Sequence, residues 1–282
     1  MSGRSVEVRG RKILLLEDGD GTPLVYLHGF ADVHGVKESW MPFHERLFQG
    51  ARVIAPAHPG CAASQPNEDL ESADAVVFHY LELFDALQLD RFHLAGACVG
   101  GWIAAEIAVR HPEKILGLVL IGAAGLFVPG SMIGDIFMMA QPERGVSYAG
   151  LREMLFSRAD HPLALELFPD GRGAVEDELR RYQMLRFTSQ FGFRPPYLYD
   201  RRLADRLHRV RSPALFIWGE RDRMVPAAHG EAYAKGIPTA SGVKIVAGAG
   251  HSVHVEKPEE TAGLVLGFLD GARTRAKDLA KS

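Results

Sequence analysis

The stretch that decides the fold is Phe92-His93-Leu94-Ala95-Gly96-Ala97-Cys98-Val99-Gly100-Gly101-Trp102. Its first residues have the apolar character and length of a β-strand, and a helix is predicted from about Val99 to Arg110. The strand and the helix are joined by a tight turn with Cys98 at its centre. Such a turn strains its central residue, and only small neighbours tolerate that geometry, which accounts for Gly96 and Gly100 on either side of Cys98. The pattern therefore presents the Cys98 thiol at the carboxyl edge of a sheet, beside the positive end of a helix.

Short apolar runs alternate with amphipathic stretches on both sides of this turn. The predicted strands are 12–16, 24–27, 52–55, 92–95, 115–121, 214–218 and 243–246. The predicted helices are 38–48, 72–87, 99–110, 227–234 and 259–268. Residues 115–121 are so uniformly apolar that both faces of that strand must be covered. The alternation predicts an α/β protein with a mostly parallel central sheet flanked by helices.

The alternation stops between Phe127 and Val210. This segment contains five of the eight methionines and seven of the fifteen phenylalanines. An insertion between two strands of one sheet is the simplest explanation. We therefore predict a core formed by residues 1–126 and 211–282, and a helical cap formed by residues 127–210.

Composition narrows the classes of function. The chain has 282 residues, of which 47% are hydrophobic and 24% charged, with a formal charge of −3 and no long basic run. A nucleic-acid partner is therefore not expected. No apolar segment approaches the roughly 18 residues of a membrane span, and the first residues lack a signal peptide, so the prediction is a cytoplasmic protein with no membrane partner. Two cysteines without a CxxC motif predict neither a disulfide framework nor a metal site.

Two loops carry residues that complement Cys98. Asp222 follows the predicted strand 214–218, and His251 follows the strand 243–246. Both loops leave the same edge of a parallel sheet as Cys98, so the three side chains can meet although they are far apart in sequence. A nucleophile, a carboxylate that orients a histidine, and the histidine as base form a catalytic triad in the chain order nucleophile, acid, base.

A third loop can supply hydrogen-bond donors. The strand 24–27 ends in His28-Gly29-Phe30, at the same edge of the predicted sheet. The backbone N–H of Phe30 can join that of Val99 in stabilising negative charge on a substrate oxygen. The sequence thus predicts an oxyanion hole formed by Phe30 and Val99.

With these motifs in place, the sequence resembles the α/β-hydrolase superfamily. The matching pieces are Leu27 to Phe30, Ala55 to Gly60, Gly96 to Gly101, Gly219 to Pro226, and Gly250 to Pro258. They cover nearly the whole chain outside the cap. The resemblance implies an α/β-hydrolase fold with a helical cap inserted after the sixth strand, and it is greatest to capped esterases, lactonases and carbon–carbon hydrolases. It implies Cys98 as nucleophile, Asp222 as acid and His251 as base, with no metal or organic cofactor.

The nucleophile departs from the family pattern, because most of these families have serine at this position. The strand-to-helix turn at Cys98 is called the nucleophile elbow in this superfamily. Cysteine occurs at the elbow in dienelactone hydrolases and polyhydroxyalkanoate synthases, and Cys98-Val99-Gly100-Gly101 is similar to the lipase-like box of the synthases. A serine replaced by cysteine to trap an acyl-enzyme would leave the same sequence. Native cysteine and engineered cysteine both stay open.

Other residues compete with this assignment. Glu220 is the alternative acid, and His254 is expected to position the His251 loop. Cys61 and His58 are expected to be a small loop residue and a loop-capping or pocket residue, respectively. The predicted substrate contacts are His28, Trp102, Phe137 and Met138. The cap arginines 152, 180, 181 and 186 could bind a carboxylate but are expected to be solvated.

The predicted function is hydrolysis of an ester, lactone or thioester of a small, largely apolar substrate through an acyl-enzyme on Cys98. Two alternatives use the same site, acyl transfer to an acceptor other than water and hydrolysis of a carbon–carbon bond. A ligand receptor without catalysis is the weakest alternative, because the triad is complete. The sequence names no substrate and leaves the oligomeric state open, with a homodimer as one option.

Overall fold

The computed structural model describes residues 3–141, 147–171, 174–193 and 197–279. Within them, an eight-stranded sheet has the order β1-β2-β4-β3-β5-β6-β7-β8. Its strands are β1 Arg4–Val8, β2 Arg11–Asp18, β3 Pro23–Leu27, β4 Arg52–Pro56, β5 Phe92–Ala97, β6 Ile115–Ile121, β7 Ala214–Gly219 and β8 Ala240–Val246. The β1–β2 and β2–β4 pairs are antiparallel, and the other neighbours are parallel. The prediction of a mostly parallel sheet is confirmed, while β1 was missed.

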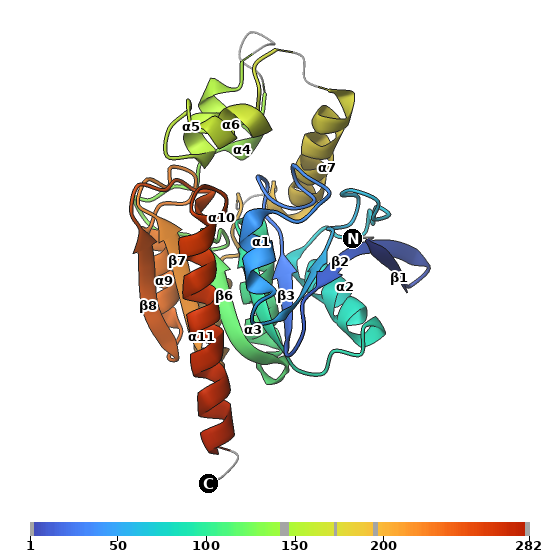
Figure 1. The fold of residues 1–282 in the computed structure, drawn as a ribbon, viewed down its shortest axis with the longest axis vertical. Helices are drawn as coiled ribbons and strands as arrows, with labels where there is room; N and C mark the ends of the chain where they lie inside the picture. Colours follow the sequence, from blue (N-terminus) through green and yellow to red (C-terminus); the bar gives the residue numbers. More distant parts are fainter. Residues whose placement is uncertain (1–2, 142–146, 172–173, 194–196, 280–282) are drawn as a thin grey trace.

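Helices cover both faces of the sheet (Figure 1). Those of the core are α1 Pro42–Leu47, α2 Ala73–Ala86, α3 Val99–Arg110, α9 Ala228–Gly236, α10 Val253–Glu256 and α11 Pro258–Leu279, and a 3-10 turn, η1 Pro112–Lys114, precedes β6. Helices α1 and α11 pack together over one face, where Phe43 and Val265 are buried against the strands. Helices α2, α3 and α9 cover the other face. Both faces of the central strands are therefore shielded from solvent, which accounts for the nearly continuous apolar character of β6.

Two predicted helices have different bounds. The helix predicted at 38–48 begins only at Pro42, because proline lacks an N–H and its ring clashes with a preceding helical turn. The helix predicted at 259–268 continues to Leu279. Its buried positions Ala262, Val265, Leu269 and Ala272 keep the three- and four-residue spacing of one helical face.

Residues 122–213 connect β6 to β7 and will be called the inserted segment. They contain α4 Ile136–Met139, α5 Ala149–Leu155, α6 Pro162–Leu167, α7 Val175–Gly192, α8 Leu203–Arg206 and the 3-10 turn η2 Leu207–Arg209. Figure 1 shows α4 to α7 beyond the carboxyl ends of the parallel strands, the edge from which the loops with Cys98, Asp222 and His251 leave. No helix of the described residues is long and apolar enough to cross a membrane.

Candidate active site

Cys98 occupies a strained turn between β5 and α3. Its backbone has φ 54° and ψ −119°, a conformation that side chains other than glycine rarely adopt. The two flanking glycines make room for it: a Cβ on Gly96 would lie 2.3 Å from the Gly100 carbonyl oxygen, and a Cβ on Gly100 would lie 2.1 Å from that of Leu27. The turn therefore depends on both glycines, and it places Cys98 at the N-terminus of α3.

His251 lies between Asp222 and Cys98. Its Nδ1 is 2.9 Å from Oδ2 of Asp222, and its side chain also interacts with the Cys98 sulfur. The other oxygen of Asp222 accepts the backbone N–H groups of Met224 (3.0 Å) and Val225 (2.8 Å). The carboxylate is fully buried, so these three contacts fix its position and, with it, the plane of the imidazole.

The His251 imidazole favours its protonated form. Burial alone would lower its pKa, but the negative charges of Asp222 and of Cys98 and the hydrogen bonds to both raise that pKa to about 10. A protonated imidazole therefore lies beside the Cys98 sulfur at the N-terminus of α3.

The predicted oxyanion donors flank the Cys98 side chain. Val99 is the first residue of α3, so its N–H has no partner four residues earlier in the helix. Phe30 lies in the β3–α1 loop (residues 28–41), directly after Gly29. A Cβ on Gly29 would be 3.1 Å from the Cβ of Cys98, so the loop passes close to Cys98.

A small cavity adjoins Cys98, with a volume of about 10 Å³, enough for roughly one water molecule. Apolar side chains dominate its wall, which is formed by Phe30, Cys98, Val99, Ala124, Ile136, Met184, Leu185, Thr188, Leu198 and Met224. Both predicted oxyanion residues are part of this wall. Four of the ten come from the β3–α1 loop, the elbow and the loop after β7, and six come from the inserted segment. A substrate larger than one water must extend past this cavity or displace part of its wall.

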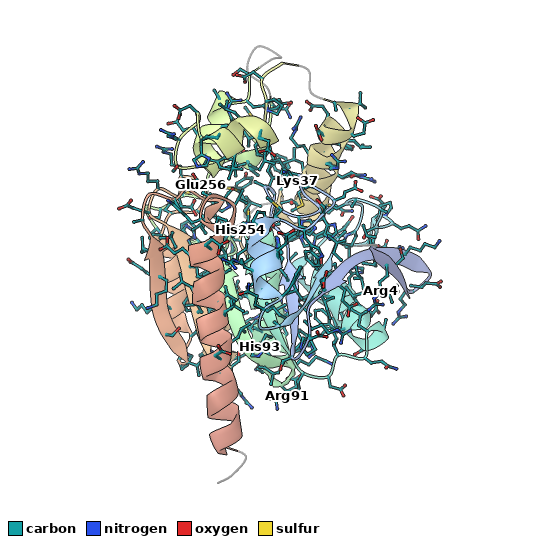
Figure 2. The ribbon with its side chains drawn as sticks, viewed as in Figure 1. Arg4, Lys37, Arg91, His93, His254 and Glu256 are labelled. Carbon is teal, nitrogen blue, oxygen red and sulfur yellow. The ribbon has the colours of Figure 1, made fainter. Side chains whose placement is uncertain are left out.

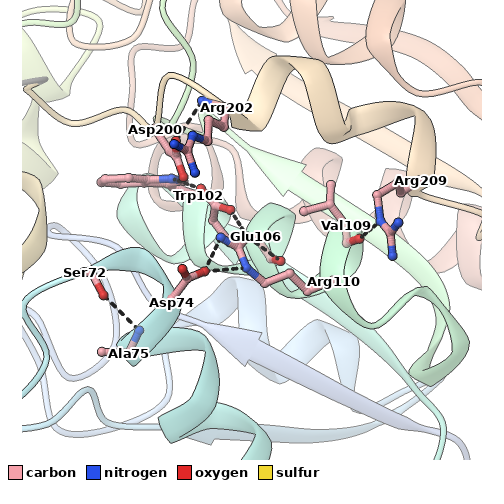
Figure 3. A network of polar contacts seen from close by, with 10 residues as sticks. All are labelled: Ser72, Asp74, Ala75, Trp102, Glu106, Val109, Arg110, Asp200, Arg202 and Arg209. Carbon is pink, nitrogen blue, oxygen red and sulfur yellow. Dashed lines mark hydrogen bonds and ion pairs between the residues drawn. The ribbon is translucent and has the colours of Figure 1, made fainter.

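None of the four predicted substrate contacts is part of that wall. Trp102 is buried under α7, where its indole N–H donates to Glu106 (2.9 Å) in a polar network that continues to Arg110 and Asp74 (Figure 3). Phe137 stacks edge-on against Phe193, and Met138 is 68% exposed. The structure thus places these three side chains in packing or surface positions.

His28 is also buried away from the cavity. Its Nε2 accepts the backbone N–H of His58 (3.0 Å), and the two rings are in contact, with their centres 3.9 Å apart and their planes tilted by 33°. Burial and the neighbouring His58 and His34 hold the pKa of His28 well below its ordinary value. His58 in turn contacts the Tyr80 hydroxyl and the His28 carbonyl, so both rings act here as neutral hydrogen-bonding groups.

The competing residues have other partners. Glu220 accepts the backbone N–H of Gly248 (2.9 Å), and the fully buried Cys61 contacts the sulfur of Met184 (3.9 Å). The arginines of the inserted segment pair with carboxylates of the protein, in the pairs Arg152–Asp170, Arg180–Glu38, Arg181–Glu178 and Arg186–Glu68. Arg152 and Arg181 are buried, contrary to the expectation of solvated side chains. No group of three metal-ligating side chains occurs in the part of the chain that the structure describes.

Sequence reasoning missed two buried carboxylates that hold the site together. Asp32, in the β3–α1 loop, contacts His254. No recognisable sequence motif marks Asp32 as part of the site. Glu256, at the end of α10, accepts the backbone N–H of Gly250 (2.6 Å) and both the N–H and the hydroxyl of Ser157. Figure 2 labels His254 and Glu256 beneath the inserted segment. The available signal for Glu256 was its place five residues after the motif histidine His251.

The chain belongs to the α/β-hydrolase family, because the family model described as alpha/beta hydrolase fold matches residues 22–258. It is 33% identical, over 94% of its length and 69% of the relative's, to the dihydrolipoyllysine-residue acetyltransferase component of an acetoin cleaving system from Pseudomonas putida. It is 30% identical to 2-hydroxymuconate semialdehyde hydrolase from Pseudomonas sp. strain CF600, over 97% and 96% of the two lengths. Among solved structures, carboxylesterase CesB from Bacillus subtilis is similar at a TM-score of 0.73 and 25% identity, over 96% and 92%.

Proposed function

We propose that this α/β-hydrolase cleaves an ester, lactone or thioester bond of a small, largely apolar substrate through an acyl-enzyme on Cys98. One observation carries the proposal. The His251 imidazole stands between the buried Asp222 carboxylate and a cysteine whose strained backbone turns it toward a cavity. Positive φ alone does not distinguish Cys98, but its φ of 54° is combined with a ψ of −119° at the N-terminus of α3, and strained backbone of this kind clusters at active sites.

In the first half of the reaction, the Cys98 sulfur anion attacks the carbonyl carbon of the substrate. The electron pair of the carbonyl bond moves to oxygen, where the N–H groups of Phe30 and Val99 stabilise it. When the tetrahedral adduct collapses, the bond to the leaving group breaks, and the leaving oxygen or sulfur takes the proton from His251. The products of this step are the free alcohol or thiol and a thioester on Cys98.

In the second half, His251 acts as a base. Acylation removes the negative charge of the sulfur, which is one of the groups that raise the His251 pKa. The neutral imidazole then accepts a proton from water, the hydroxide adds to the thioester carbon, and collapse releases the carboxylic acid and regenerates the Cys98–His251 pair. The same imidazole is thus acid in one half and base in the other.

The inserted segment is proposed to be the cap, with residues 127–210 as its extent and residues 1–126 and 211–282 as the catalytic core. Residues 127–210 contribute Ile136, Met184, Leu185, Thr188 and Leu198 to the cavity wall, and four of these are apolar. The flexible methionine adapts to ligands of different shape. The apolar lining supports an apolar acyl group as the part of the substrate next to Cys98.

The test compares the protein with Cys98→Ser and Cys98→Ala on p-nitrophenyl esters of short and aromatic acids. The expected result is turnover with a mass increase of one acyl group on the peptide that contains Cys98, and loss of both in Cys98→Ala. A faster Cys98→Ser enzyme would identify cysteine as a replacement for serine, whereas an inert one would identify the thiol as native. Absence of any acylation of Cys98 by ester, lactone or thioester would overturn the proposal.

Acyl transfer is the second candidate, because a cysteine thioester passes its acyl group readily to other thiols and one relative is named an acetyltransferase. Turnover in the presence of competing thiols or alcohols separates the two: transfer gives the acylated acceptor, and hydrolysis gives the free acid. Carbon–carbon bond hydrolysis is the remaining alternative, and the similarity to 2-hydroxymuconate semialdehyde hydrolase supports it.

A further inference from the structure

Asp32 is a fully buried carboxylate within the β3–α1 loop, outside the triad. It accepts hydrogen bonds from the Tyr26 hydroxyl (2.7 Å) and from the backbone N–H groups of Gly29 (3.0 Å) and Val33 (2.7 Å). Burial alone would raise its pKa, but His254, His44 and the Tyr26 hydroxyl hold the pKa of Asp32 well below its ordinary value. The group is therefore a charged carboxylate in the protein interior, which is costly unless it is paired and hydrogen-bonded.

The two oxygens of Asp32 have different neighbours. Oδ2 accepts from Gly29 and lies 3.2 Å from Nε2 of His254. Oδ1 accepts from Val33 and lies 3.5 Å from Nε2 of His44, in α1. Gly29 directly precedes Phe30, and His254 is three residues after His251. A single oxygen atom therefore joins the loop of the predicted oxyanion donor to the segment that carries the base.

We infer that Asp32 is a positioning residue that holds the Phe30 N–H at a fixed place relative to the Cys98–His251 pair. This inference rests on the proposed function. The carboxylate orients the Gly29–Phe30 peptide through the Gly29 N–H, and His254 anchors the carboxylate to α10. The backbone segment Gly29–Phe30 passes so close to Cys98 that a small shift of the loop moves the donor away from the substrate oxygen.

Packing around the junction leaves it little freedom. The ring of His254 lies 5.5 Å from that of Phe43, and the ring of His44 lies 4.7 Å from that of Tyr26, centre to centre. His254, His44 and Tyr26 are all buried. In contrast, the His251–Asp222 contact and the Gly250–Glu256 hydrogen bond hold the base without Asp32. Loss of Asp32 should therefore disturb the oxyanion donor while it leaves the nucleophile and its base in place.

Two reactions of Cys98 separate these roles. Acylation by p-nitrophenyl acetate forms an oxyanion, whereas alkylation by iodoacetamide displaces iodide and forms none. Both need the Cys98 sulfur anion beside His251. In Asp32→Asn, the expected result is an acylation rate lower by about 100-fold, the loss typical of a misplaced catalytic group, with an alkylation rate within about 3-fold of the original protein.

His254→Gln and His44→Gln form a matched pair that serves even if Asp32→Asn does not fold. Both remove a buried ring from the same carboxylate, but only His254 joins it to the base segment. His254→Gln is expected to lower acylation by about 10-fold with unchanged alkylation, and His44→Gln to leave both rates within about 3-fold.

The outcomes are distinct. Selective loss of acylation in Asp32→Asn or His254→Gln supports the inference. Equal losses of acylation and alkylation in these variants, or equal behaviour of His254→Gln and His44→Gln, would make Asp32 a merely structural residue and overturn it. If the original protein is alkylated but never acylated, the proposed function fails, and this inference falls with it.

Discussion

The carboxyl edge of the sheet and the inserted segment both border the cavity at Cys98, yet they are built differently. At the edge, buried polar groups hold the loops: Asp222, Asp32 and Glu256 each accept several hydrogen bonds away from water. The inserted segment also has a buried polar group, Arg152, which donates to the Phe168 carbonyl and to Asp170, but the part of it that lines the cavity is mostly apolar. Among the described residues, the exposed large apolar side chains lie in this segment except for Phe78 and Ile245.

The connections between the two regions show the same contrast. The ion pairs Lys37–Glu166 and Arg180–Glu38 join the two regions at the surface. Surface ion pairs contribute little to the free energy of unfolding. Glu256 joins them in the interior through Ser157. Polar groups fix atoms within tenths of an ångström, whereas apolar contacts are non-directional. The edge is therefore suited to chemistry and the segment to the choice of substrate.

The largest effect is expected from Asp222→Asn, because Asp222 is the carboxylate at the carboxyl edge of the sheet that orients His251. Asparagine keeps the shape but removes the charge that raises the His251 pKa, so turnover should fall by about 10³-fold. In the original protein the imidazolium is lost as pH rises through about 10, so ester acylation should fall on that alkaline side. In Asp222→Asn this fall should begin at lower pH. Rate profiles of p-nitrophenyl ester acylation from pH 6 to 11 measure both changes.

An alkaline limb that does not move in Asp222→Asn would show that Asp222 is not what tunes His251. Glu220→Gln is the matched control, because Glu220 occupies the same loop and binds only the Gly248 backbone. Its rate and its pH profile should stay close to those of the original protein.

If buried polar groups hold the core, its stability must depend on pH. Burial lowers the pKa of His58 to about 3 and those of His44 and His79 to about 4, below the value of about 6.5 in an unfolded chain. These histidines are neutral in the folded protein. The stability of the fold therefore does not suffer from them above pH 6.5, and it falls as the pH drops toward 4, because the unfolded chain takes up protons that the buried rings do not. Each can cost about 3 kcal/mol over that interval.

Urea unfolding at pH 7 and pH 4.5 measures this dependence. His79→Leu should lose less stability between the two pH values than the original protein, since it removes one group that must take up a proton on unfolding. His111→Gln, at a half-exposed position, is the control and should leave the difference unchanged. Equal behaviour of the two variants would contradict the explanation by burial.

Glu256→Gln tests the buried connection between the regions. The amide retains one acceptor oxygen and turns an N–H₂ group toward donors, so at least one of Gly250 and Ser157 loses its partner. The free energy of unfolding should fall by about 2 kcal/mol. The control is Glu166→Gln, which removes a surface ion pair between the same two regions and should cost less than about 1 kcal/mol. Equal costs in denaturant unfolding would remove the contrast.

The smallest effect is expected from Leu185→Ala in the inserted segment. Leu185 is part of the cavity wall and only partly buried, so its removal enlarges the space near Cys98 at modest cost in stability. The ratio of kcat/KM for a hexanoate over an acetate ester should rise by about 10-fold. Tyr182→Ala, on the exposed side of the same helix, should leave the ratio unchanged. A uniform loss on both esters would place Leu185 with the edge rather than with substrate choice.

Local sequence carried much of this structure. The elbow could be predicted because glycines at 96 and 100 are needed wherever backbone atoms approach within about 2 Å of where a Cβ would be. Strand β6 could be predicted because a strand buried on both faces must be apolar throughout. Strand β1 was missed, since Arg4–Val8 is a short, mostly exposed edge strand whose only apolar residues are Val6 and Val8. The prediction of Phe137 and Met138 as substrate contacts was based only on the methionine and phenylalanine content of the inserted segment. Composition does not determine the direction in which either side chain points.

The sequence by itself determined the class of fold and the three side chains proposed for catalysis, because glycine spacing and the succession of strands and helices along the chain are local features that show where strands end. Only the tertiary structure decided what surrounds them. The junction of Asp32 with His254 and that of Glu256 with Ser157 join residues 222 and 99 positions apart, respectively. A buried carboxylate must find its donors wherever folding brings them, so its partners are a property of the packed chain and not of the residues beside it.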